Sequence, residues 1–341
     1  MKPQRVLIVS NTNYRSAKMF LDQSWKFAKG FIRLGCDVKI FSYNSAVRMA
    51  SPLKSKNFLR FFKSKADDAL AEYIKSYLPQ IVLISFPEFL DYKSLQLIKD
   101  ASPGSILIGF DGDPWPKLQK DNRIGTAKKL DILLATNCGQ YLEDYRSAGV
   151  KKCFFIPNLC DPDIEHPYDV GPQWKSDILW TGKVKHSAYS KEDIREQIVS
   201  RLVKKENCRV YGCLGQEQIG GLQYLYAISG AKIGLSINAV NSVRMYHSDR
   251  LTYYLSCGTF VLAKSVPDSN LLFKDREHLR YFETAEEFFD LAAWYLKHDD
   301  ERLKIANAGM EYIHREFNCQ KIAGYILDCI DKEHYAAPWM T

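Results

Sequence analysis

Several features of secreted, membrane-spanning and disulfide-linked proteins are missing from this sequence. No apolar run approaches the roughly 18 residues that a membrane-spanning helix needs. The nine cysteines are an odd number and form no CxxC pair, which disfavours a disulfide framework and a structural zinc site. The first residues lead directly into an apolar segment, without the pattern of a signal peptide. We therefore expect a cytoplasmic protein with reduced thiols.

Common nucleotide- and metal-binding motifs are missing as well. The first predicted strand is not followed by GxGxxG, the fingerprint of dinucleotide binding, and no GxxxxGK[ST] occurs, which disfavours a P-loop kinase or ATPase. No HExxH motif and no grouping of a DxD motif with a histidine suggests a metal site. We expect neither a cofactor nor a metal ion.

The composition is that of a soluble globular protein. Of the 341 residues, 46% are hydrophobic and 26% are charged, which excludes a disordered chain. This length predicts two domains, because a single core rarely grows that large. The net charge of +7 fits an anionic ligand, an anionic membrane surface or nucleic acid, and does not choose among them.

Apolar strands and amphipathic helices alternate twice along the chain. In the first half we predict strands at 5–10, 37–41, 81–86, 105–110, 131–136 and 153–156. A proline-rich segment, 157–167, follows, and the alternation then restarts with strands at 177–182, 208–212, 231–237, 259–263 and 279–282. The pattern predicts an α/β protein with two Rossmann-like, doubly wound domains that face a cleft.

We place the boundaries of these domains by the composition of the connecting segments. The predicted first domain covers 1–160, the linker 161–172 and the second domain 173–317. Residues 318–341 are predicted to form a helix and tail that pack back on the first domain.

The stretch 242–264 has the features of an anion-binding corner. A basic, hydroxyl-rich loop leads into a predicted helix at 248–256, which Cys257 and Gly258 end before an apolar strand. Free backbone N–H groups and the positive end of a helix dipole together favour phosphate binding. The candidate ligand contacts in this stretch are Arg244, Tyr246, His247, Ser248, Asp249, Arg250 and Tyr253.

Two other strand ends in the second half carry matching chemistry. Thr181, Gly182 and Lys183 offer backbone N–H groups, a hydroxyl and an ammonium group. Tyr211 and Gly212 offer a ring and a close backbone approach, which suit a flat base. Phosphate, sugar and base contacts together indicate a nucleotide-type ligand. The competing interpretation is that Lys183, Lys185 and the arginines are ordinary surface charges.

The first half offers two features with open interpretations. Asp111 and Asp113 follow a central strand, where open α/β sheets bind ligands, but both are also common turn formers. The segment Lys54–Lys65 is basic and aromatic. It fits either a solvated helix with one buried face or a surface for membrane headgroups or an anionic acceptor.

Three segments resemble a known family. SDRLTYYLSCGTFVL at 248–262 is similar to the SDRxFEALACGxFLL block of CgeB-type, group 1 glycosyltransferases of the GT-B fold. Residues 279–309 resemble that family's closing segment, and 155–167 resembles its inter-domain linker. The resemblance covers the second half well and the first half in outline. It implies transfer of a sugar from a nucleotide-diphosphate sugar, with the donor bound mainly by the second domain and the acceptor mainly by the first.

The resemblance also bears on the chemistry. It implies a metal-independent reaction in which Lys183, Arg244, Arg250 and the helix start near Ser248 stabilise the leaving diphosphate. Group 1 relatives usually retain the anomeric configuration. An inverting enzyme would instead need a base, and we name Asp111, Asp113 and Glu88 as candidates.

One position departs from the family. The glutamate that would hold the donor ribose in related transferases is replaced by Tyr253, which carries no charge at neutral pH. Two alternatives to an ordinary transferase therefore stay open. The first is a glycosyltransferase-like binding protein without turnover. The second is a transferase that docks DNA or a lipid-linked acceptor through Lys54–Lys65, at the inner membrane face in the lipid case.

Overall fold

A computed structural model describes residues 4–12, 22–51, 62–85, 90–114, 120–184 and 194–340. The chain divides into two compact units. The first comprises Met1–Ile156 and Cys319–Tyr335, and the second comprises Pro157–Asn318 and Ala336–Thr341. The segment predicted as a linker, 161–172, is thus part of the second unit.

The first unit is built on a parallel sheet. Its strands are β1 (Arg5–Ser10), β2 (Asp37–Ser42), β3 (Ile81–Ser85), β4 (Ile106–Asp111), β5 (Ile132–Ala135) and β6 (Cys153–Phe155). They lie in the order β2-β1-β3-β4-β5-β6. The central strands are buried throughout because helices cover both faces, as their continuous apolar runs predict.

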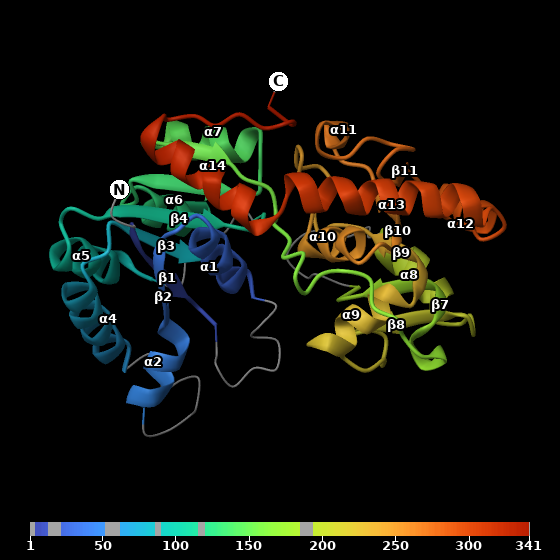
Figure 1. Ribbon diagram of the computed structural model, residues 1–341, viewed down its shortest axis with the longest axis horizontal. Helices are drawn as coiled ribbons and strands as arrows, with labels where there is room; N and C mark the ends of the chain where they lie inside the picture. Colours follow the sequence, from blue (N-terminus) through green and yellow to red (C-terminus); the bar gives the residue numbers. More distant parts are fainter. Residues whose placement is uncertain are drawn as a thin grey trace. The chain divides into compact units, whose positions relative to one another are not determined.

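The helices of this unit are α1 (Gln23–Arg33), α2 (Tyr43–Ala50), α4 (Lys63–Tyr77), α5 (Tyr92–Ala101), α6 (Lys120–Ala127), α7 (Gln140–Ser147) and α14 (Cys319–Asp331). Helix α14 comes from the end of the chain and packs against α1 (Figure 1). The two helices meet at Gly30, where a Cβ atom would overlap the carbonyl group of Cys319.

The second unit repeats the architecture with five parallel strands. These are β7 (Ser176–Thr181), β8 (Cys208–Tyr211), β9 (Ala231–Ser236), β10 (Phe260–Lys264) and β11 (Arg280–Phe282). Their order is β11-β10-β9-β7-β8, so the first strand of the unit, β7, lies between β8 and β9. Connections from β7 and β9 therefore leave the sheet in opposite directions, which makes the boundary between them a topological switch point.

Helices again cover both faces of this sheet. They are the 3₁₀ helix η5 (Pro172–Trp174) and the α-helices α8 (Ile194–Leu202), α9 (Leu222–Ser229), α10 (Asp249–Ser256), α11 (Ser269–Leu272), α12 (Ala285–Tyr295) and α13 (Asp299–Glu316). Trp180, Phe260 and Phe288 are fully buried in the core. Helix α10 packs closely on β9 because Gly234 leaves room for the ring of Tyr254. The prediction of an α/β protein with two Rossmann-like units is confirmed.

Candidate functional site

The switch point of the second unit brings together the ends of β7 and β9. Ligands of open α/β sheets bind in the crevice at such a point, outside the carboxyl ends of the strands. Thr181 ends β7, and Gly182 and Lys183 follow it, while the segment 237–248 follows β9 and leads into α10. The sequence placed candidate ligand contacts in both segments, and the sheet order makes these segments neighbours.

Arg250, in the first turn of α10, spans this switch point. Its Nε donates to the Thr181 carbonyl at 2.6 Å, and its Nη1 donates to the Ile237 carbonyl at 3.0 Å. The guanidinium carbon lies 4.1 Å from the centroid of the Trp180 ring, close enough for a cation–π interaction. A half-buried positive charge thus sits where the topology predicts a ligand.

The start of α10 leaves its N-cap hydroxyl unused. Ser248 is the N-cap residue, yet its side chain makes no capping hydrogen bond, and its buried Oγ has no partner among the described residues. Its backbone N–H is held by Asn238 Oδ1 at 3.0 Å. Because the cap does not take up the orphan N–H groups of the first helical turn, the helix start is suited to an anion.

Two glycine turns lie at the ends of β7 and β8. Gly182 and Gly212 have φ values of 119° and 83°, in the region that favours glycine. The turns are joined by a hydrogen bond from Gly182 N–H to the Tyr211 carbonyl at 2.9 Å. Beside them lies a pocket of about 340 Å³, lined by Lys183, Val184, Glu196, Gly212, Cys213 and Leu214. Its volume is in the range of small-molecule sites.

Tyrosine hydroxyl groups gather behind Thr181. Thr181 Oγ1 lies 3.0 Å from the Tyr254 hydroxyl and 3.4 Å from that of Tyr224. The ring of Tyr224 meets that of Tyr253 edge-on, with centroids 5.4 Å apart. Burial raises the pKa of Tyr224 and of Tyr254, so both stay neutral hydrogen-bonding groups. Sequence reasoning missed Tyr224, because nothing in the pattern of α9 distinguishes it from a packing residue.

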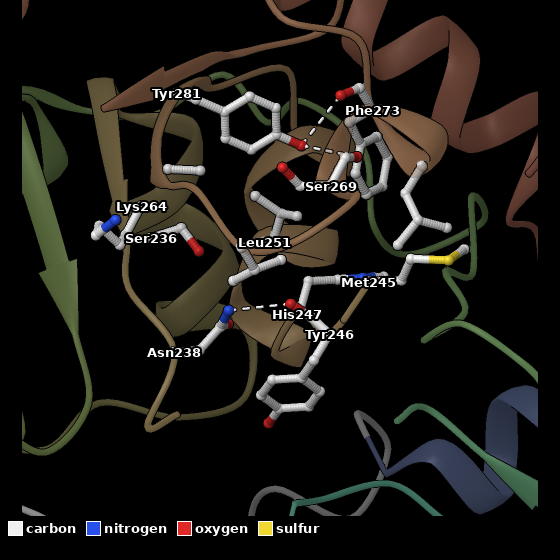
Figure 2. Close-up of a pocket in the computed structure, with 13 residues that line it drawn as sticks. Ser236, Asn238, Met245, Tyr246, His247, Leu251, Lys264, Ser269, Phe273 and Tyr281 are labelled. Carbon is white, nitrogen blue, oxygen red and sulfur yellow. Dashed lines mark hydrogen bonds between the residues drawn. The ribbon is translucent and has the colours of Figure 1, made fainter. Parts of the chain in front are cut away.

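Three candidates of the 242–264 stretch lie apart from the contacts between Arg250 and the strand ends. Arg244 is exposed and forms an ion pair with Asp268. Tyr246 and His247 are buried and line a cavity of about 20 Å³, enough for one water molecule. Figure 2 shows this cavity and the hydrogen bond at 3.0 Å from Asn238 Nδ2 to the Tyr246 carbonyl, which fixes the loop.

His247 is a buried, neutral histidine. Its ring packs edge-on against Phe273, and neither ring nitrogen has a hydrogen-bond partner among the described residues. Burial lowers its pKa from 6.5 to about 4, and the Met245 backbone offsets this only in part. The geometry therefore gives His247 a packing role at neutral pH.

The carboxylates predicted in the first unit have different environments. Asp111 is buried, forms an ion pair with Arg123 and accepts a hydrogen bond from the Tyr145 hydroxyl at 2.7 Å. Burial raises its pKa against the opposing effect of Arg123. Asp113 is exposed, and Glu88 lies outside the described residues. These contacts favour the structural interpretation of Asp111 over a role as a base.

Other candidates of the sequence are described only in part. Within Lys54–Lys65 the structure describes 62–65, where Lys63 pairs with Asp91 at 2.8 Å and with Asp67 at 3.4 Å. Lys185 lies outside the described residues. Over the part of the chain that is described, no group of three or more His, Cys, Asp or Glu side chains could hold a metal ion. Within the same part, no helix is both long and apolar enough to cross a membrane.

Comparison with known proteins relates this architecture to a class of enzymes. Residues 171–328 match a family described as glycosyl transferase-like. No curated protein matches the sequence significantly.

Solved structures align over nearly the whole chain. HepE from Anabaena, in complex with UDP and glucose, has 11% sequence identity and a TM-score of 0.61, over 96% of this chain and 100% of its own. A glycosyltransferase from Rickettsia africae has 14% identity and a TM-score of 0.64, over 97% and 99%. Sucrose-phosphate synthase from Thermosynechococcus elongatus has 12% identity and a TM-score of 0.63, over 97% and 99%.

At these identities the structural likeness establishes the fold, which is the GT-B fold of glycosyltransferases. The match to the glycosyl transferase-like family lies in residues 171–328, and the fold of the chain as a whole is the one that these glycosyltransferase structures share. The more specific resemblance to the CgeB-type subfamily stays a prediction.

Proposed function

We propose that this protein transfers a sugar from a nucleotide-diphosphate sugar and binds this donor at the switch point between β7 and β9. The observation that carries the proposal is that Arg250, in the first turn of the uncapped helix α10, contacts the end of β7 and the segment after β9, with Gly182 directly beside it. The complex of HepE with UDP and glucose supports uridine donors as the first to test.

Each part of the donor has a matching group in this proposal. The diphosphate binds the start of α10 near Ser248, with the ammonium group of Lys183 as counter-charge. The base enters the pocket beside Gly212. The ribose hydroxyls meet the neutral phenols of Tyr253 and Tyr224, where related transferases use a carboxylate.

The proposed reaction needs neither metal nor cofactor. Charge that develops on the leaving diphosphate is stabilised by fixed N–H groups and by Lys183, which need no reorganisation during the reaction. We propose retention of the anomeric configuration. Should the reaction invert, Asp113 and Glu88 are better bases than Asp111, whose carboxylate is taken up by Arg123 and Tyr145.

Turnover of a donor panel tests this proposal. The intact protein is incubated with UDP-, GDP-, dTDP-, ADP- and CMP-linked sugars, with and without a library of glycan, lipid and nucleic-acid acceptors, and free nucleotide is measured. We expect release from one donor class that rises when the acceptor is present. Release from no donor would contradict the proposal, and the product's anomeric signals in NMR decide between retention and inversion.

A second candidate is a binding protein that has lost turnover, and the observation that favours it is Tyr253. Such a protein would bind a nucleotide sugar without releasing nucleotide, and Tyr253→Glu would then generate turnover. An active wild type whose rate is unchanged or lowered by Tyr253→Glu would exclude it.

A transferase that acts on DNA or on an anionic lipid is a separate alternative, and it predicts acceptor binding that weakens steeply as the salt concentration rises.

A further inference from the structure

We propose that Arg250 is a positioning residue of the donor site: it holds the carboxyl ends of β7 and β9 in register instead of neutralising the donor diphosphate. The proposal rests on the proposed function, because it assigns a role within the same crevice. It differs from the role that the sequence suggested for Arg250, which was a direct contact with phosphate.

The first observation is how the guanidinium group is used. Its Nε and Nη1 donate to backbone carbonyls on opposite sides of the switch point, those of Thr181 and Ile237. The two acceptors lie on segments that have no ladder hydrogen bonds with each other there, since β7 pairs with β9 only from Ser176 to Leu179. Arg250 therefore replaces the sheet's own hydrogen bonds where the strands diverge.

The second observation is the fixed orientation of the group. One face of the guanidinium lies over Trp180, which is fully buried and cannot shift readily. Trp180 Nε1 in turn donates to the Gly182 carbonyl at 3.0 Å. The ring of Trp180 thus orients both the cation and the turn that follows β7.

The third observation is the fit between Arg250 and Gly182. A Cβ atom at Gly182 would lie 2.8 Å from Nη2 of Arg250, closer than real contacts allow. Gly182 also has a φ of 119°. The turn can pass this close to Arg250 because residue 182 has no Cβ atom, and Lys183 follows directly from this turn.

These contacts leave Lys183 as the better counter-charge. Lys183 is exposed and makes no ion pair within the described part of the chain. Arg250 is half-buried, and its two bonded nitrogens point toward protein carbonyls. A planar fork can bridge two carbonyls, whereas the single ammonium of a lysine cannot reproduce that geometry.

Lysine and glutamine variants separate positioning from charge. We compare wild type, Arg250→Lys and Arg250→Gln for binding of UDP, GDP, dTDP, ADP and their nucleosides, by calorimetry and ligand-observed NMR. We expect both variants to weaken the preferred diphosphate by a similar factor, on the order of tenfold. Its nucleoside should weaken in parallel, since the whole turn is displaced. Arg276→Lys and Arg276→Gln, at an exposed arginine of the same unit, are the matched controls.

Three other results would overturn the proposal. The first is that Arg250→Lys binds the diphosphate as tightly as wild type, Arg250→Gln loses it, and nucleoside binding is unchanged in both variants. That pattern would show a charge that contacts the phosphate directly. A lower midpoint of thermal unfolding with unchanged affinity would mean a purely structural role. If the wild type binds no diphosphate at all, the proposed function fails and this proposal fails with it. If the wild type binds and only the pattern of the variants differs, this proposal alone fails.

Discussion

Burial changes what two titratable side chains of this protein can do. Asp111 and His247 both follow the pattern of candidate site residues in the sequence, and both are at least nine-tenths buried. Asp111 is stabilised by a charged partner, Arg123, whereas the ring of His247 packs among aromatic residues. The two environments lead to different predictions.

Replacing Asp111 should mainly cost stability. In Asp111→Asn the guanidinium of Arg123 stays buried without its counter-charge, and breaking such a pair costs about 3 kcal/mol of unfolding free energy. Urea unfolding of the purified variant measures the loss. Asp113→Asn, at an exposed neighbour, is the control and should change stability by less than about 0.5 kcal/mol. Equal stabilities of the two variants would contradict the structural role of Asp111.

His247 should make the second unit sensitive to acid. Its pKa in the folded state is about 4, below the 6.5 of an unfolded chain, so the unfolded state binds the proton first as the pH falls. Stability is therefore full above pH 6.5 and declines between about 6.5 and 4, by about 3 kcal/mol in total.

Urea unfolding at a series of pH values checks this contribution. His247→Phe keeps an aromatic ring and removes the titration, so the wild type should lose more stability than this variant between pH 6.5 and 4. His334→Gln, at an exposed histidine, serves as the control and should follow the wild type. Parallel pH curves for wild type and His247→Phe would show that His247 makes no such contribution.

At the scale of elements, α14 depends on a glycine in α1. In Gly30→Ala the new Cβ would overlap the carbonyl group of Cys319, so α14 must shift and the first unit should lose about 2 kcal/mol or more. Gly324→Ala lies on α14 with no atom within 4 Å, and should stabilise the helix by about 0.5–1 kcal/mol. Chemical unfolding of both variants checks the pair. Opposite signs are expected, and a stabilising Gly30→Ala would contradict the close packing.

The turn after β7 gives a second prediction for an element. Gly182→Ala should displace Arg250 and weaken binding of the preferred nucleoside diphosphate on the order of tenfold, the same factor that we expect for Arg250→Lys. Gly215→Ala is a matched control, because its φ of 78° is also positive but no atom lies within 4 Å. It carries the backbone strain without the overlap. Titration calorimetry compares the two, and equal affinities would argue against the contact.

The strands and helices of both units could be predicted from the sequence, whereas the tertiary contacts of their side chains could not. Hydrophobic runs gave the strands of both sheets, and the 242–264 stretch gave α10 and β10. The bridge made by Arg250 could not be predicted, because its acceptor Thr181 lies 69 residues away and the contact depends on strand order. Tyr224 was missed for the same reason. Burial of His247 and Asp111 likewise depends on tertiary packing, which composition and spacing do not reveal.

At the scale of the whole molecule, the two units share an architecture, but the family match and the candidate donor site lie mainly in the second unit. The matched family covers 171–328, and the candidate donor site lies entirely within the second unit. In the first unit, Asp113 and Glu88 remain predictions, as does a docking role for Lys54–Lys65. We therefore propose, from the resemblance, that the donor binds the second unit and the acceptor the first, and an experiment that maps the bound donor tests this division.

Hydrogen–deuterium exchange of the intact protein, with and without the preferred nucleoside diphosphate, tests the central claim most directly. A bound ligand protects the amides it contacts and those of the segments it holds closed. We predict slower exchange in peptides that cover Thr181–Lys183, Gly212–Leu214 and Ser248–Tyr253. Protection confined to the first unit, or unchanged exchange at saturating ligand, would contradict a donor site at the switch point between β7 and β9.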